Sequence, residues 1–235
     1  MGVSSNVVRR ARLLPSLVFL FSLAVIVGSI IASSGASASG SHRSRCFPRG
    51  ANTIALDRRV RVYSMPEYVE GVRTKRAGTY TCLLHRGTTL ALKPTRRKRP
   101  LRELEHITLA GTIVAFVDFQ HGIDSGCDVI EVIDMAKSRT VLVVPEVGCS
   151  VDGGFVKSEG ATDLVVNEHG TVAWIVTRSG FGHPSESIEV HSETTSGSTA
   201  LLDSGTGIVP GSLRLAPGGE VTWLDAGRLL YAHLS

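Results

Sequence analysis

The sequence lacks the short motifs by which catalytic centres are usually recognised. After residue 38 there is no Gly-x-Ser-x-Gly nucleophile elbow, no His-Glu-x-x-His zinc motif and no glycine-rich phosphate loop. There is also no Cys-x-x-Cys pair, the spacing typical of a structural zinc site. The motifs therefore indicate no catalytic residue, no metal ligand and no cofactor.

Residues 1–38 contain no acidic residue, and the basic side chains Arg9, Arg10 and Arg12 lie near their start. An uncharged apolar stretch, 13–32, follows them, and Ala36-Ser37-Ala38 fits a small-x-small cleavage site. This order predicts a signal peptide over residues 1–38. The stretch from Leu13 to Ala32 is about 20 residues long, enough to span a bilayer, so an uncleaved membrane anchor is the alternative. In either case we expect the rest of the chain to be secreted or extracytoplasmic.

A strong excess of positive charge is also missing. The formal net charge is +4, but without the three leader arginines the chain has 22 basic and 21 acidic residues. Nucleic-acid binding needs a dense positive surface, so we expect no nucleic-acid partner. The basic run at 93–99 contains Pro94 and is followed by Pro100, and it is interpreted as a solvated linker.

Cysteine is scarce, and all four residues follow the leader: Cys46, Cys82, Cys127 and Cys149. An even number in an exported chain predicts disulfides. Residues 128–134 and 140–144 resemble two strands joined by a turn at 136–139, and Cys127 and Cys149 are equidistant from residue 138. An antiparallel hairpin would place these two cysteines opposite each other. The remaining pair, Cys46 and Cys82, then follows by elimination.

No segment after the leader keeps a helical period over a dozen residues. The one helix-like candidate is short, Leu101 to His106. Short runs rich in Val, Ile, Thr and aromatic residues instead alternate with Gly, Pro, Asp and Asn. This pattern predicts an all-β fold of the propeller, barrel or sandwich type.

The β-type runs repeat along the chain. Strands that contain Tyr63, Phe116, Trp174 and Trp223 recur at spacings of 53, 58 and 49 residues. Each has a short apolar run before it, and one or two further runs follow it. Units of about 50 residues with four strands each have the period of propeller blades. We expect Phe116, Trp174 and Trp223 to pack between neighbouring units.

Three of these runs carry a family resemblance. The stretches Gly170-Thr-Val-Ala-Trp174, Ile188-Glu-Val-His191 and Ile130-Glu-Val-Ile-Asp-Met135 look like blade strands of the WD40-like or TolB-type β-propellers of bacterial secreted proteins. The resemblance covers about residues 51–235. It implies a packing pattern and no functional residue.

The predicted organisation is a leader (1–38), a polar lead-in (39–50) and a propeller-like domain of about four four-stranded blades (51–235). The last unit ends one strand short, which leaves ring closure by the strand near Ile54, an open arc and closure by a partner chain as alternatives. A β-sandwich is the structural alternative.

Candidate binding residues come from the turns that follow the aromatic strands. Loops on a rigid scaffold often carry function, and these turns would share one face of a propeller. The residues chosen are Tyr68, His121, Phe181 and His183. The densest polar cluster, Asp118, His121, Asp124 and Asp128, is interpreted as a long turn, with a cation site as the alternative.

These observations predict an exported, non-enzymatic binding or scaffold module for an unknown protein or a cell-surface glycan. The first alternative is an extracytoplasmic hydrolase of glycans or peptides, with carboxylates such as Asp118, Asp163 and Asp225. The second is a membrane-tethered assembly component anchored through residues 13–32. Solvent-facing carboxylates around the axis of the domain would favour the hydrolase.

Overall fold

The computed structural model describes residues 45–69, 72–93, 104–121, 125–151, 159–180 and 183–234. They form strands in four antiparallel sheets, each with its strands in chain order. The first sheet holds β1 (Asn52–Leu56), β2 (Val60–Val69), β3 (Val72–Leu83) and β4 (Thr88–Lys93); the second holds β5 (Glu105–Ala110), β6 (Ile113–His121), β7 (Ser125–Asp134) and β8 (Arg139–Val151). The third holds β9 (Glu159–Val166), β10 (Val172–Gly180), β11 (His183–Glu193) and β12 (Thr199–Gly205); the fourth holds β13 (Arg214–Leu215), β14 (Glu220–Asp225) and β15 (Arg228–His233).

The all-β prediction and the repeat order are confirmed, and one element was predicted wrongly. Glu105 and His106, the end of the helix-like candidate, belong to strand β5. Residues 101–103, its beginning, lie outside the described residues. The reason is tertiary: β5 pairs with β6 and packs Ile107 and Leu109 against the first sheet, and such packing overrides a weak local preference for helix.

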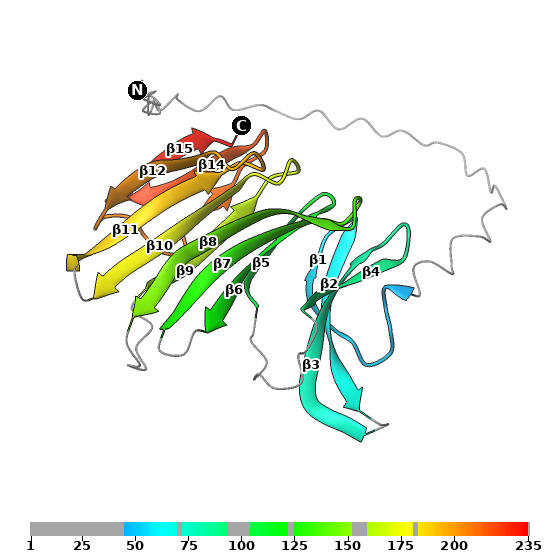
Figure 1. Cartoon of the computed structure of the whole chain (residues 1–235). Helices are drawn as coiled ribbons and strands as arrows, with labels where there is room; N and C mark the ends of the chain where they lie inside the picture. The colour runs from blue at the N-terminus through cyan, green and yellow to red at the C-terminus, as the bar shows by residue number, and fades with distance from the viewer. Residues whose placement is uncertain are drawn as a thin grey trace, which may run out of the picture.

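Apolar clusters join each sheet to the next one along the chain, and Figure 1 shows the sheets as successive layers. Phe116 packs between the first and second sheets, Trp174 between the second and third, and Trp223 between the third and fourth. All three side chains are buried. The prediction that these aromatic residues pack between units is therefore confirmed.

The first strands of successive sheets also touch one another. β1 contacts β5, β5 contacts β9, and β9 contacts β13. The strand around Ile54 is β1, and it pairs with β2 in the first sheet. It therefore does not complete the fourth sheet, which has three strands among the described residues.

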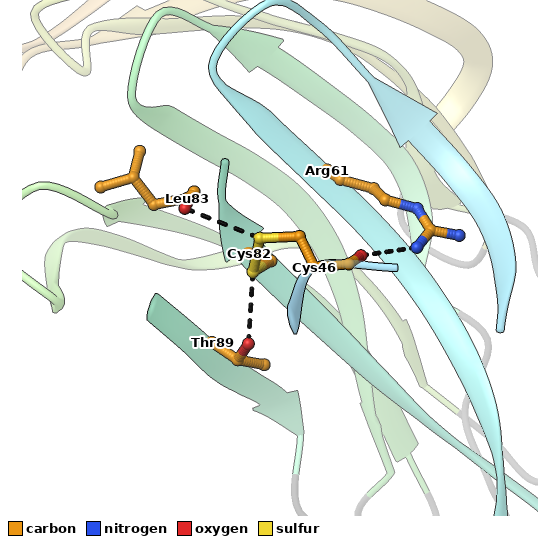
Figure 2. The surroundings of a disulfide bond; sticks show 5 residues. All are labelled: Cys46, Arg61, Cys82, Leu83 and Thr89. Carbon is orange, nitrogen blue, oxygen red and sulfur yellow. Dashed lines mark hydrogen bonds between the residues drawn. A yellow bond between two sulfur atoms is a disulfide. The ribbon is translucent and has the colours of Figure 1, made fainter. Parts of the chain in front are cut away.

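The far face of the first sheet is covered by the end of the polar lead-in. Cys46 forms a disulfide with Cys82 on β3, as predicted by elimination. Figure 2 shows this bond beside Arg61 of β2, whose Nη1 donates a hydrogen bond to the Cys46 carbonyl oxygen at 2.6 Å. Thr89 on β4 donates to the Cys82 sulfur at 3.3 Å. The disulfide and Arg61 together fix residues 46–51 on this sheet.

The second predicted pair lies in the hairpin of β7 and β8. The register places Cys127 directly opposite Cys149, as expected, and Cys127 is disulfide-bonded. The side chain of Cys149 lies outside the described residues. Among the described residues, no helix is long and apolar enough to cross a membrane.

Candidate functional site

The structure places Tyr68 near the end of β2, His121 at the end of β6 and His183 at the start of β11. Tyr68 pairs with Arg73 near the β2–β3 turn, His121 with Gly126 at the β6–β7 turn, and His183 with Gly180 at the β10–β11 turn. The arrows of β2, β6 and β10 all point toward the lower side of Figure 1, so these three strands end on the same side of their sheets. Phe181 and the side chains of the other three lie outside the described residues, and the binding site there stays a prediction.

Two acidic residues of the polar cluster at 118–128, Asp118 and Asp128, lie on opposite faces of the second sheet. Asp118 is 1% exposed, and strand alternation places it on the face of β6 that carries Phe116, toward the first sheet. Asp128 is fully buried on the opposite face, where Oδ2 accepts a hydrogen bond from the Ala161 backbone amide at 2.9 Å. Asp124 and the His121 side chain lie outside the described residues. No metal-binding group of three His, Cys, Asp or Glu side chains occurs in the described part of the chain.

A polar cleft lies at the other end of the strands, between the second and third sheets. Its volume is about 460 Å³. It is formed by the β7–β8, β9–β10 and β11–β12 turns and the strand residues beside them, and its lining comprises Ile113, Asp134, Lys137, Arg139, Thr140, Val141, Glu168, His169 and Thr195. Ile113 begins β6 and His121 ends it, so a nine-residue strand separates the cleft from the predicted turns, roughly 27 Å.

Asp134 shapes the β7–β8 wall of the cleft. Its Oδ1 accepts hydrogen bonds from the backbone amides of Ala136 at 2.9 Å and Lys137 at 3.3 Å, and Oδ2 lies 3.0 Å from Lys137 Nζ. Burial raises the pKa of Asp134, but the hydrogen bonds and the charge of Lys137 outweigh it, so the pKa lies below its ordinary value. Asp134 is thus ionised at neutral pH and is engaged within its own turn.

Asn167 shapes the opposite wall in the same way. Its Oδ1 accepts hydrogen bonds from the backbone amides of His169 at 2.9 Å and Thr171 at 3.0 Å. Its Nδ2 donates to the Leu234 carbonyl oxygen at 3.2 Å, which ties this turn to the end of the described chain. A side-chain oxygen thus fixes each turn, and both turns are rigid for the same physical reason.

Two glycines allow the turns around the cleft to approach closely. Gly170 has φ +86°, and a Cβ there would lie 2.9 Å from Cγ2 of Thr195 in the β11–β12 turn. Gly111, with φ +60°, lies beneath Glu168, whose Oε1 would be 3.2 Å from a Cβ. The β9–β10 turn therefore packs closely against two other turns, β5–β6 of the second sheet and β11–β12 of the third.

The rim of the cleft carries basic and acidic side chains. Lys137, Arg139, Glu168 and His169 are exposed at the rim. Arg139, Glu168 and His169 form no ion pair within the described part of the chain. Thr140 and Thr195 add hydroxyl groups to the lining. The cleft can therefore take a polar ligand that carries both positive and negative groups.

No sequence motif marks the cleft, because its residues come from turns of two adjacent units. The sequence does contain one indication of these turns, an Asp or Asn at the start of each tight turn: Asp57, Asp134 and Asn167. Each accepts two backbone amides from its own turn. Such residues mark rigid turns, but the sequence does not show which turns face each other.

Three partly buried polar side chains, Arg178, Glu189 and His191, lie on the face of the third sheet that is turned toward the second sheet. The His191 ring stacks on Trp174 with centroids 5.4 Å apart, and His191 Nε2 lies 2.8 Å from Glu189 Oε2. Arg178 Nε donates to the same oxygen at 3.0 Å. These contacts join β10 to β11 and are interpreted as structural.

The three carboxylates considered for a hydrolase are buried or bonded to other groups of the protein. Asp118 is buried. Asp163 Oδ2 accepts a hydrogen bond from the Leu213 backbone amide at 3.2 Å, which links the third and fourth sheets. Asp225 Oδ2 lies 3.3 Å from Arg228 Nη2 across the β14–β15 turn.

Comparison with known proteins adds no family assignment. No protein-family model matches the chain, and no curated protein matches it.

Proposed function

We propose that this protein is an exported, non-enzymatic binding module with a propeller-like fold. Four meander sheets in chain order, apolar layers between successive sheets and contacts between their first strands support the propeller-like arrangement. The Cys46–Cys82 disulfide supports an extracytoplasmic location.

The observation that carries the proposed function is the cleft between the second and third sheets. Its walls are turns held by Asp134 and Asn167, so the site is organised before a ligand arrives. Its rim presents Lys137 and Arg139 on one side and Glu168 on the other. A ligand of matching charge pattern gains electrostatic complementarity on both sides.

A polypeptide segment of a partner protein fits this chemistry best. Peptides carry acidic and basic side chains along one extended backbone, and the hydroxyls of Thr140 and Thr195 can bond to that backbone. Sugar rings usually stack on aromatic side chains, and the described lining has only the His169 imidazole for that purpose. The internal contacts of Asp163 and Asp225, and the burial of Asp118, also favour a binding module over the hydrolase.

The test is binding of synthetic peptides and of cell-surface glycans to the wild type and to two variants. We expect saturable, salt-sensitive binding of peptides that carry both charges. The double variant Lys137→Ala/Arg139→Ala should bind at least about tenfold more weakly, because two charge-assisted contacts are lost. The control Arg86→Ala changes an exposed arginine in a turn of the first sheet and should bind like the wild type.

Three results would overturn the proposal. Equal binding by the wild type and the double variant would remove the cleft as the site. Binding of glycans alone would replace the peptide ligand. Cleavage of the bound peptide would favour the hydrolase, and sequencing of the recovered peptides detects it.

A further inference from the structure

The fourth sheet ends in a strand with an unpaired edge. In the first three sheets the third strand is covered by a fourth, but β15 has no further partner among the described residues. The hairpin turn pairs Asp225 with Arg228, and Leu234 N donates to the Gly219 carbonyl oxygen at 2.9 Å. By alternation, the amides and carbonyls of Leu229, Tyr231 and His233 therefore point away from β14.

This edge is also the most regular one. The ladders that attach the outer strands β4, β8 and β12 each contain a register shift. Bulges of this kind disturb an edge and protect it from pairing with another strand. β14 and β15 pair without a shift over all six residues. β15 is thus the outermost strand that is best suited to accept a further one.

The side chains on β15 favour such pairing. Leu229 is 60% exposed and lies opposite Leu224, which is 37% exposed, on the face away from the third sheet. Tyr231 lies on the same face by strand alternation. Leu230 and Ala232 face the core beneath Trp223. An added strand would cover apolar surface on one face and extend the core on the other.

The polar lead-in cannot supply the missing strand. Cys46 is held on the first sheet, and residues 39–44 span at most about 20 Å. The second and third sheets lie between the first and the fourth, and each packed layer adds about 10 Å, so this segment does not reach the far edge of the fourth sheet. Residues 1–38 are predicted either to be removed or to lie in a bilayer. A second copy of the chain can bring its own β15 to this edge without these limits.

We propose that two copies of this protein pair through their β15 strands, antiparallel about a two-fold axis, to form one six-stranded sheet. The sequence of β15 is complementary to itself in one register. With Leu230 opposite Leu230 of the second copy, Leu229 lies opposite Tyr231, and symmetry makes this pair twice. Arg228 then faces Ala232, so no like charges are opposed. In this register the free amides of Leu229 and Tyr231 find carbonyl partners across the axis.

The test is sedimentation equilibrium of the exported protein and of two matched variants. The wild type should be a dimer. Leu229→Lys places two lysines at the new contact and should raise the dimer dissociation constant at least about tenfold. Leu201→Lys is the control, because Leu201 is 57% exposed on the outer strand β12, whose ladder is bulged. It should leave the dimer unchanged.

Hydrogen exchange measures the register directly. The amides of Leu229 and Tyr231 should become more protected as the protein concentration rises. Thermal unfolding of the lysine variants verifies that both are folded. A wild type that stays monomeric would overturn the proposal and indicate a different protein at this edge. A Leu229→Lys protein that still dimerises, or a Leu201→Lys protein that does not, would overturn the role of β15. Each of these outcomes is independent of peptide binding in the cleft.

Discussion

Arg61 is a buried arginine that contacts backbone carbonyl oxygens, a hydroxyl group and two aromatic rings. It is 4% exposed, and its Nε and Nη2 donate to Thr53 Oγ1 at 2.9 and 2.7 Å. Its guanidinium lies 4.4 Å from the centroid of Phe47 and 4.9 Å from that of Tyr63. The planar, five-donor guanidinium satisfies all these contacts together, and a lysine ammonium does not.

The first prediction is therefore that Arg61→Lys destabilises the protein. We expect the free energy of unfolding to fall by about 2 kcal/mol, because the Cys46 carbonyl and Thr53 lose charge-assisted hydrogen bonds. Urea denaturation followed by circular dichroism measures this. Arg58→Lys, at an exposed position beside the same strand, is the control and should change little. Equal stability of the two variants would contradict the role given to Arg61.

The second prediction concerns pH and Glu189. Burial raises the pKa of Glu189, but hydrogen bonds from His191 and Arg178 and their charges outweigh burial and leave the pKa below 4.5. Because the pKa is lower in the folded state, the stabilisation is complete above the unfolded-state pKa and is lost as the pH falls through the folded-state pKa. Glu189→Gln should lower the free energy of unfolding by about 1 kcal/mol at neutral pH.

In strong acid the wild type and Glu189→Gln should have the same stability, since the wild-type carboxyl is then neutral as well. Thermal unfolding of both proteins over a pH series measures the difference. A difference that stays constant from neutral to acid pH would show that the charge of Glu189 contributes nothing.

At the scale of the elements, glycine allows two hairpin turns of the third sheet to pack closely. Gly170 and Gly197 both have positive φ, +86° and +81°, in neighbouring turns of the third sheet. A Cβ at Gly170 would lie 2.9 Å from Thr195 Cγ2, whereas a Cβ at Gly197 meets nothing within 4 Å. A comparison of alanine substitutions at Gly170 and Gly197 therefore distinguishes the cost of positive φ from the cost of a close contact.

The third prediction is that Gly197→Ala costs about 1 kcal/mol of unfolding free energy and Gly170→Ala costs about 1 kcal/mol more. Both substitutions carry the penalty of a left-handed backbone, and only the second displaces Thr195. Parallel urea denaturation of the two variants measures the difference. Equal losses would show that the β11–β12 turn moves away without cost.

Much of the element order was predictable from the chain. The aromatic strands, their spacing and the short strands before them follow from local runs of β-type residues. The ends of the strands were not predictable: β7 and β8 extend to Ser125 and Val151 through Gly, Ser and Cys residues. Their strand conformation comes from pairing across the hairpin, since residues of this kind have little preference for strand by themselves.

At the scale of the whole molecule, the two end sheets differ in how their outer faces are covered. The first sheet has residues 46–51 on its outer face, held by the Cys46–Cys82 disulfide and Arg61. The fourth sheet has three strands and exposes Leu224 and Leu229 on its outer face. The second and third sheets have an apolar cluster on each side.

The fourth prediction is that the fourth sheet opens first. In a stack where each sheet contacts only its neighbours, local stability falls with the number of covered faces. Backbone amides of β14 should therefore exchange with solvent faster than those of β6 and β10 under native conditions. Hydrogen exchange with mass spectrometry at low protein concentration, where copies do not pair, measures this. Faster exchange in β10 than in β14 would contradict the layered stability.

The candidate site was harder to predict than the fold. The predicted residues Tyr68, His121 and His183 lie where the second strands end and the third strands begin, whereas the cleft lies at the opposite end of the strands. The Asx residues that hold the cleft walls are visible in the sequence. That the turns of two different sheets enclose one cleft depends on how the sheets stack, which no local pattern records.

The sequence by itself determined the class of fold, the four repeats, the inter-sheet aromatic residues and the pairing of Cys46 with Cys82. These follow from residue preferences and from register within a hairpin, which act over short distances along the chain. The tertiary structure alone decided that Glu105 and His106 belong to strand β5, that β1 belongs to the first sheet, that a cleft lies between Lys137 and Glu168, and that β15 is a regular edge strand among the described residues. Bulges, buried charges and open edges arise where distant segments meet, and their energies depend on contacts that the linear sequence does not specify.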